Sequence, residues 1–228
     1  MEQSIHVLSL GGSLVYPEEI NISFLKQFRR FITREIKHGK RFIIIVGGGG
    51  PARKFQDAAG RIVRVSDEDK DWIGIHATRM NAQLLRTIFK HEAHPVLLKN
   101  RHNVRSFDGH SLIIGAGWHP GWSTDFVAVQ VAIDFGVHTV VNLGRAAYVY
   151  NKDNRRFTNA KPFHKLSWQE YMRYIPRKWT PGIHAPVDPV AAKLAKKHRV
   201  RVIVAGGNNF KNIRNILNGR LFKGTTIT

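Results

Sequence analysis

The sequence has no cysteine and no long apolar run. The absence of cysteine from its 228 residues excludes disulfides, thiolate metal sites and a cysteine nucleophile. No apolar run approaches the roughly 20 residues that a membrane-spanning helix needs. The first residues also lack the basic start and apolar stretch of a secretory signal. We therefore expect a cytoplasmic protein without a membrane partner.

Acidic residues are scarce as well. There are 16 Asp and Glu residues against 36 Lys and Arg, for a net charge of +20. Such an excess attracts polyanions, which include nucleic acids and phosphorylated metabolites. The basic residues are spread along the chain, and no helix-turn-helix, metal-finger or RRM motif accompanies them. Nucleic acid stays an open alternative, but small phosphorylated molecules are the partners we expect.

Short apolar stretches alternate with amphipathic ones. The pattern predicts strands at Ile5–Leu10, Phe42–Val46, Ser111–Ile114, Thr139–Leu143, Val200–Ala205 and Thr225–Thr228. It predicts helices at Ile22–Lys37, from Pro51, and at Trp72–Lys90, Ser123–Phe135, Val187–Lys197 and Phe210–Leu217. This alternation indicates an α/β protein: one domain over residues 1–228, with a mostly parallel sheet sandwiched between helices in three αβα layers.

Four of the predicted strands end in glycines: Gly11-Gly12, Gly47 to Gly50, Gly115-Ala116-Gly117 and Gly206-Gly207. In parallel sheets, ligands bind beyond the carboxyl ends of the strands. Glycines followed by a helix start present bare backbone N–H groups to an anion, and a missing Cβ lets a phosphate approach. A single pair could be only a tight turn. Their repetition at one edge predicts polyphosphate binding.

A second informative segment places Ser123, Thr124 and Asp125 at the start of a predicted buried helix. Ser123 or Thr124 suits the N-cap, and Asp125 suits the first turn electrostatically. In a phosphoryl-transfer enzyme the same carboxylate would orient donor groups or metal-bound phosphates. Spacing alone leaves both roles open.

Two familiar nucleotide motifs are absent, namely a Walker A loop and a G-x-G-x-x-G after the first strand. The run His91 to His94 also lacks the H-E-x-x-H spacing of a zinc site, and we expect its histidines at the surface.

Several segments, in order along nearly the whole chain, resemble the archaeal-type UMP kinases of the amino-acid-kinase family. They are VLSLGGS (7–13), IVGGGGPAR (45–53), DWIGIHATRMNA (71–82), PGWSTD (120–125), YVYNKD (148–153), PGIHAPVDPVAAKLA (181–195) and FKGTTIT (222–228). The resemblance implies the amino-acid-kinase fold. It also implies an acceptor-binding half over residues 1–136 and an ATP-binding half over residues 137–228.

The resemblance further implies transfer of the γ-phosphoryl group of ATP to UMP, with Mg²⁺ bound through the phosphates and no protein metal site. The implied ATP contacts are Ser9, Leu10, Gly11, Gly12, Ser13, Gly49, Arg53, Gly144, Tyr150 and Asp153. The implied UMP contacts are Gly48, Asp71, Trp118, His119, Pro120, Gly121, Trp122, Ser123 and Thr124. Because relatives of this type form hexamers, a homo-oligomer is expected.

Catalytic roles are expected for Gly11, Gly12, Arg53 and Asp125. Phosphoryl transfer needs positioning and electrostatic stabilisation rather than covalent participation by the protein. The amides of Gly11, Gly12, Gly48 and Gly49, with cationic Arg53, would supply that stabilisation. Ser9 stands where many amino-acid kinases carry a lysine, as is common in the archaeal-type UMP branch.

One segment departs from the family pattern. Where the family reads N-x-T/S-N-V/I-D, this chain has Gly144, Arg145 and Ala147 in place of the hydroxyl, amide and carboxylate residues, and Asn154 replaces a usual proline. Arg145 could compensate by pairing with phosphate, or ATP binding could be weakened. The alternatives are therefore a weakened or non-catalytic nucleotide sensor, a kinase for another small acceptor, and a basic RNA-associated protein.

Overall fold

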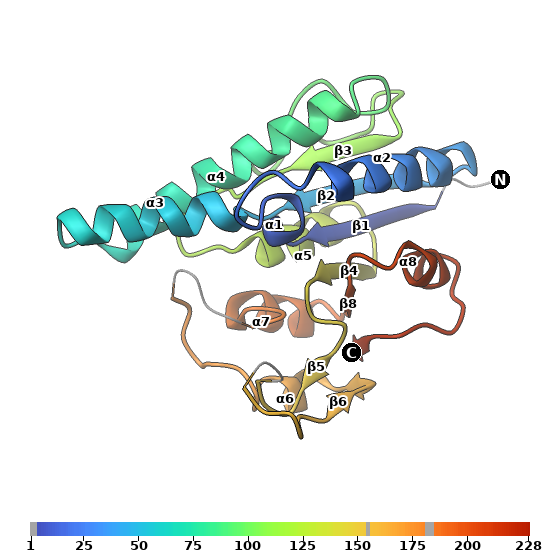
Figure 1. The fold of residues 1–228 in the computed structure, drawn as a ribbon. Helices are drawn as coiled ribbons and strands as arrows, with labels where there is room; N and C mark the ends of the chain where they lie inside the picture. Colours follow the sequence, from blue (N-terminus) through green and yellow to red (C-terminus); the bar gives the residue numbers. More distant parts are fainter. Residues whose placement is uncertain (1–3, 154–155, 181–184) are drawn as a thin grey trace.

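The structure is a computed structural model that describes residues 4–153, 156–180 and 185–228 (Figure 1). Its centre is a seven-stranded sheet in the order β3-β2-β1-β4-β8-β9-β7. The strands are β1 (Ile5–Leu10), β2 (Arg41–Val46), β3 (Leu112–Gly115), β4 (Thr139–Gly144), β7 (Lys165–Leu166), β8 (Arg201–Gly206) and β9 (Thr225–Ile227). β3, β2, β1, β4 and β8 run parallel, while β9 is antiparallel to β8. The expected mostly parallel sheet is confirmed.

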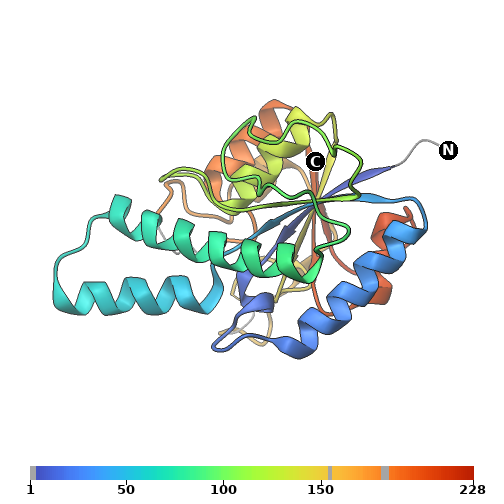
Figure 2. The same ribbon diagram turned by 90° about the horizontal axis from the view of Figure 1, so that it is seen from above.

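Helices cover both faces of this sheet, as Figure 2 shows from above. One face carries α1 (Gly12–Val15), α2 (Ile22–Lys37), α4 (Asp67–Ile88) and α8 (Phe210–Leu217), and the other carries α5 (Thr124–Asp134), α6 (Trp168–Tyr171) and α7 (Pro189–Lys197). Helix α3 (Gly49–Ile62) pairs with α4 in a hairpin that projects from the body. β5 (Val149–Tyr150) and β6 (Pro162–Phe163) form a separate two-stranded sheet. The three-layer αβα arrangement is therefore confirmed.

Strand β2 shows why the continuous apolar runs form the centre. Phe42 to Val46 are all 0% exposed. Ile43 and Ile45 contribute to the core beneath α5 and α7, whereas Phe42, Ile44 and Val46 contribute to the core beneath α2 and α4. Because side chains alternate across a strand, a central strand covered on both faces must be apolar at every position.

Helix α2 has the predicted boundaries. The Asn21 side chain accepts a hydrogen bond from the Phe24 amide at 3.0 Å, and Gly39 follows the helix with a φ of +82°. Asn21 therefore supplies one of the acceptors that a helix N-terminus lacks, and glycine tolerates the left-handed turn that ends the helix. Helix α4 begins at Asp67 rather than at the predicted Trp72, because Ser66 caps it and three acidic residues fill its first turn.

The expectation of surface histidines at 91–94 is wrong for His94. This residue is 7% exposed, and its Nε2 lies 3.1 Å from the Asp108 carboxylate. Among the described residues, no helix combines the length and apolarity needed to cross a membrane.

The turns after β1 and β2 touch backbone to backbone. A Cβ on Gly12 would lie 2.3 Å from the Gly47 carbonyl oxygen and from the Gly49 nitrogen. A Cβ on Gly47 would lie 2.7 Å from the Gly12 nitrogen. These glycines therefore permit a close approach of two main chains, which holds the two turns side by side at the carboxyl edge of the sheet.

A matched pair of substitutions tests this contact. Gly12→Ala should destabilise the protein by about 2–3 kcal/mol, because the new methyl group overpacks rigid backbone. Gly144→Ala should change the free energy of unfolding by less than about 0.5 kcal/mol, since a Cβ there meets nothing within 4 Å. Urea denaturation of both variants measures the difference. Equal effects would contradict the proposed contact.

Candidate active site

Five polar side chains meet where β1 and β4 end and where α5 and α7 begin. They are Ser9, Ser123, Asp125, Asn142 and Asp188, and we call them the carboxylate cluster. Ser9 and Asn142 are register partners on neighbouring parallel strands, so their side chains leave the sheet together. The N-termini of α5 and α7 bring the other three residues to the same place.

Asp125 is the centre of this cluster. Its Oδ1 accepts hydrogen bonds from the Ser9 hydroxyl at 2.7 Å and from the Asn142 amide at 2.8 Å. The residue is only partly exposed to solvent. Burial, reinforced by the nearby Asp188 charge, raises the pKa of Asp125 to about 7, and the two hydrogen bonds only partly offset this. A carboxyl group that changes charge near neutral pH is typical of a functional site.

Asp188 links the cluster to α7. Its Oδ1 accepts from the amides of Val190 at 2.8 Å and Ala191 at 3.1 Å, and its Oδ2 accepts from the Ser123 hydroxyl. The Ser123 Oγ in turn caps α5 by accepting from the Asp125 and Phe126 amides. One carboxylate and one hydroxyl thus anchor two helix N-termini against each other.

The glycine turns next to the cluster differ in which amides they leave available. The Gly11 amide donates to the Leu143 carbonyl at 2.8 Å. The sheet already uses this amide in the structure, so the contact of Gly11 with ATP stays a prediction. Over residues 4–153, 156–180 and 185–228, no hydrogen bond from the amides of Gly12, Gly48 or Gly49 is found. These three amides lie at helix starts and can serve an anion.

Leu10, Ser13 and Arg53 surround these turns. Leu10 is 1% exposed in the core, so only its backbone faces the turn, where its carbonyl accepts from the Gly47 amide. Ser13 is partly exposed in α1. Arg53 is exposed on the first part of α3, and its guanidinium donates to the Pro17 carbonyl at 3.3 Å. The Pro17 carbonyl also lies against Gly50, so the guanidinium carries positive charge near the start of α3.

Asp71 and Gly121, two of the implied UMP contacts, come together. The Asp71 Oδ2 accepts from the Gly121 amide at 2.7 Å and from the Trp179 indole N–H at 3.3 Å. Two further residues of α4 hold the strand ends. Thr78 accepts from the Gly117 amide at 2.8 Å, and Asn81 donates to the Gly47 and Gly48 carbonyls at 2.8 and 3.1 Å.

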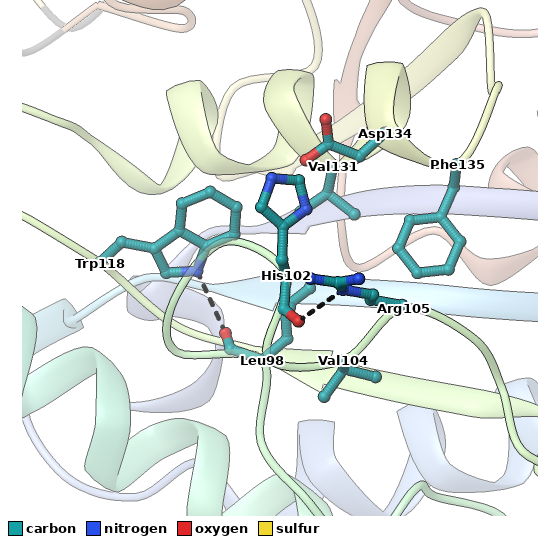
Figure 3. Close-up of a pocket in the computed structure, with 8 residues that line it drawn as sticks. All are labelled: Leu98, His102, Val104, Arg105, Trp118, Val131, Asp134 and Phe135. Atoms are coloured by element: carbon teal, nitrogen blue, oxygen red, sulfur yellow. Dashed lines mark hydrogen bonds between the residues drawn. The ribbon is translucent and has the colours of Figure 1, made fainter.

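Trp118 lies apart from the other predicted acceptor residues. It is 5% exposed and its indole N–H donates to the Leu98 carbonyl at 3.3 Å. Figure 3 shows its ring in the wall of a cavity of about 320 Å³ beside α5, whose other lining residues are Leu98, His102, Val104, Arg105, Val131, Asp134 and Phe135. By contrast, His119 and Trp122 are exposed, and the centroids of their rings lie 5.5 Å apart. Pro120 and Thr124 are partly exposed.

The predicted ATP contacts after β4 are only loosely gathered. Gly144 ends β4, and Arg145 after it is exposed. Tyr150 lies in the β5–β6 pair, and its ring contacts the Tyr148 ring at 6.2 Å. The Asp153 carboxylate lies 3.8 Å from the Arg156 guanidinium. Asn154 of the departing segment, and Pro181 to His184 of the quoted PGIHAPVDP stretch, lie outside the described residues.

The donor set suits phosphates better than a bare cation. In the described part of the chain, no three His, Asp or Glu side chains gather as ligands of a metal ion. The unused amides of Gly12, Gly48 and Gly49 suit phosphate oxygens, and Asp125 and Asp188 suit a cation that arrives with those phosphates. The residues present therefore fit ATP with Mg²⁺ carried on its phosphates.

Several residues of the site were not identified from the sequence. Asn142 and Asp188 complete the carboxylate cluster, and Trp179, Thr78 and Asn81 hold the acceptor side. An aspartate directly before a proline and an apolar helix is an N-cap signal, and this could have identified Asp188 as a helix start. Nothing in the local sequence of Trp179 indicates its contact with Asp71.

The raised pKa of Asp125 has a consequence for stability. The folded protein keeps a proton on Asp125 up to about pH 7, whereas the unfolded carboxyl group loses it near its ordinary pKa of 3.8. Between these values the folded state binds more protons, so the contribution of Asp125 to stability falls as pH rises from about 4 to about 7.

Asp125→Asn keeps an Oδ1 acceptor for Ser9 and Asn142 but has no charge. We expect it to be more stable than the parent at about pH 8 by about 1–2 kcal/mol, because the parent then carries an unfavourable negative charge in the folded state. The figure is smaller than the full pKa difference implies, since the carboxylate is partly exposed to solvent. At about pH 5 the two proteins should differ little. Urea denaturation at both pH values measures this, and an identical pH dependence in parent and variant would contradict the assignment.

Known proteins resemble this chain in sequence and in fold. Residues 4–206 match the profile of the amino acid kinase family. The chain is 30% identical to the uridylate kinases of Staphylothermus marinus and Thermoplasma acidophilum, over 93% and 96% of this chain and 94% of each relative. The crystal structure of uridylate kinase from Archaeoglobus fulgidus superimposes with a TM-score of 0.81 at 26% identity, covering 99% of this chain and 100% of that one.

Proposed function

We propose that this chain, which belongs to the amino acid kinase family, transfers the γ-phosphoryl group of ATP to UMP to give UDP. The observation that carries the proposal is the carboxyl edge of the sheet. There the unused amides of Gly12, Gly48 and Gly49 lie in adjoining turns, and Asp125, in the first turn of α5, is hydrogen-bonded to Ser9 of β1 and Asn142 of β4. Uridylate kinases related over nearly their whole length support UMP as the acceptor.

The two halves of the chain take different substrates in this proposal. Residues 1–136 hold UMP, with Asp71 and Gly121 on the nucleoside side. Residues 137–228 hold ATP, beside Gly144, Tyr150 and Asp153. The two nucleotides meet end to end at the glycine turns, which is the only way that one phosphate can reach the other without a covalent enzyme intermediate.

The reaction is a direct displacement. A phosphate oxygen of UMP forms a bond to the γ-phosphorus of ATP while the bond from that phosphorus to the β-phosphate oxygen breaks, and ADP leaves. The Gly12, Gly48 and Gly49 amides hold the equatorial oxygens, and Arg53 adds positive charge. Asp125 orients Ser9 and Asn142 toward the transferring group. Asp125 and Asp188 would face Mg²⁺ that arrives on the phosphates, and that ion would supply positive charge to offset the charge of the transition state.

Location and assembly are part of the same proposal. We place the protein in the cytoplasm, where both nucleotides are found. A homo-oligomer, with the hexamer as the expected size, is supported by apolar side chains that the α3–α4 hairpin leaves exposed: Phe55, Ile62, Val63 and Met80 are 69%, 82%, 61% and 75% exposed. Contacts between chains would remove the apolar surface of these side chains from water.

An assay of ADP release tests the activity, with UMP, CMP, isopentenyl phosphate and N-acetylglutamate compared as acceptors. UMP should give the highest kcat/KM. Asp71→Asn should raise KM for UMP about 10-fold or more with a smaller change in kcat, because the carboxylate acts on binding. Asp67→Asn is the control on the same helix, with a side chain that is 71% exposed. ATP binding without turnover on any acceptor would instead favour a nucleotide sensor.

The departing segment makes a separate prediction. Gly144→Ser, Arg145→Asn and Ala147→Asp together restore the family pattern, and Gly144 has room for a side chain. If the natural residues weaken ATP binding, the triple variant should lower KM for ATP by about 3- to 10-fold. Arg145→Ala alone should raise that KM if Arg145 pairs with phosphate. Unchanged KM in both variants would show that this segment does not contact ATP.

A further inference from the structure

A group of positively charged side chains lies at the edge of the sheet opposite to the carboxylate cluster. A cavity of about 410 Å³ opens where β4 and β8 begin and α7 ends. Its lining residues are His138, Thr139, Ser167, Trp168, Gln169, Lys196, Arg199, Arg201 and Thr228. Parallel strands run away from this edge toward the carboxylate cluster, so the cavity and the cluster lie at opposite ends of the same strands.

Three of the lining side chains are cationic and a fourth is a histidine, and they come from three different segments. His138 precedes β4, Lys196 lies in the last turn of α7 and Arg199 follows its C-cap, and Arg201 starts β8. All four are exposed. Among the described residues, none of them forms an ion pair with a side-chain carboxylate.

The local shortage of acidic residues makes this charge unusual. Half of the 36 Lys and Arg residues follow Asp134, with only Asp153, Glu170 and Asp188 as acids. Asp188 belongs to the carboxylate cluster, and Glu170 closes the capping box of α6 with Ser167. Asp153 faces Arg156. Among the described residues that line the cavity, none has a carboxylate side chain, so a bound anion would meet the positive charge of the lining side chains.

Stabilisation of α7 accounts for part of this charge. Lys196 and Lys197 occupy the last turn of α7, where cations favour the negative end of the helix dipole. The dipole does not account for Arg201, which lies on a strand. It does not explain why cations from three segments line one cavity either.

The residue that follows α7 gives independent support for an anion site. Helices α2, α5 and α8 are each followed, one residue after the C-cap, by a glycine with positive φ: Gly39 at +82°, Gly136 at +67° and Gly219 at +66°. The equivalent position after α7 is Arg199, at +53°. Glycine adopts this conformation without the penalty that a Cβ brings. At this one end, a guanidinium replaces the residue that the backbone favours.

The walls of the cavity are fixed. Trp168 is 3% exposed, and its indole N–H donates to the Val200 carbonyl at 3.1 Å. Its amide donates to the Thr228 carbonyl at 2.9 Å, which joins α6 to the end of β9. A buried aromatic wall with exposed cationic side chains at the rim suits a phosphorylated ligand that binds mainly through charge.

We propose that this cavity, with His138, Lys196, Arg199 and Arg201 around it, binds a phosphate group at a site separate from the phosphoryl-transfer edge. The phosphate is carried either by a free nucleotide or pyrophosphate, or by a nucleic-acid strand. The site does not depend on the kinase activity, because none of its residues contacts the carboxylate cluster in the described part of the chain.

Two neighbouring lysines provide a matched test. Lys196→Gln and Lys197→Gln each remove one exposed positive charge from the last turn of α7, but only Lys196 lines the cavity. Arg199→Gly removes the guanidinium and introduces the residue that favours the local backbone, so its melting temperature should equal or exceed that of the parent. A lower affinity in this variant therefore cannot result from unfolding.

The probe is a short fluorescein-labelled oligouridylate, whose binding is followed by fluorescence anisotropy at two salt concentrations, with unlabelled pyrophosphate as competitor. We expect Lys196→Gln and Arg199→Gly each to weaken binding by about 3-fold or more and to reduce the salt slope by about 0.7 for each lost contact. Lys197→Gln should change affinity by less than about 1.5-fold. ADP release with UMP should be unchanged in all three variants, which separates this site from the proposed kinase function.

The competitor identifies the carrier of the phosphate. If the oligouridylate binds much more tightly than pyrophosphate, the site serves a strand; if the two compete at similar concentrations, it serves a free phosphorylated molecule. Equal weakening by Lys196→Gln and Lys197→Gln would mean that only general positive charge attracts the probe, and would overturn the proposal. Failure of both probes to bind the parent would overturn it as well.

Discussion

The arrangement of the active edge depends on one carboxylate, Asp125, held between the ends of two strands. Hydrogen bonds from Ser9 and Asn142 attach the first turn of α5 to β1 and β4. Asp188 attaches α7 to the same point through Ser123. Burial and the nearby charge of Asp188 both disfavour the ionised form of Asp125, and its pKa is raised as a result. The helix N-termini and hydroxyl groups around them make the arrangement tolerable, and they leave a site that a cation with its phosphates would complete.

The glycine turns add a second constraint. Their first physical role is the contact between main chains at Gly12 and Gly47, which a side chain would block. A consequence of that contact is that the Gly12, Gly48 and Gly49 amides remain together, with no acceptor among the residues that the structure describes, while the Gly11 amide donates within the sheet. Packing and the phosphate binding that we propose would therefore be two results of one backbone arrangement rather than alternative explanations of it.

The sequence allowed the fold to be predicted well and the site only in part. Periodicity and caps located α2 and α8 with their observed bounds, because apolar spacing and N-caps act locally. The fully buried β2 was also recognisable from its composition. Asn142 and Asp188 were missed as site residues because their roles arise from contacts with Asp125 and Ser123 far along the chain. The environment of Trp118 beside α5, and the burial of His94 against Asp108, depend on tertiary packing in the same way.

The most direct test is a crystal structure of the protein with UMP and a non-hydrolysable ATP analogue in the presence of Mg²⁺. The account predicts that the terminal phosphate of the analogue lies within hydrogen-bonding distance of the Gly12 and Gly48 amides, with the UMP phosphate next to it and Asp125 beside both. Nucleotides bound away from this edge would contradict it. So would side chains that cover the Gly12 and Gly48 amides when both ligands are present.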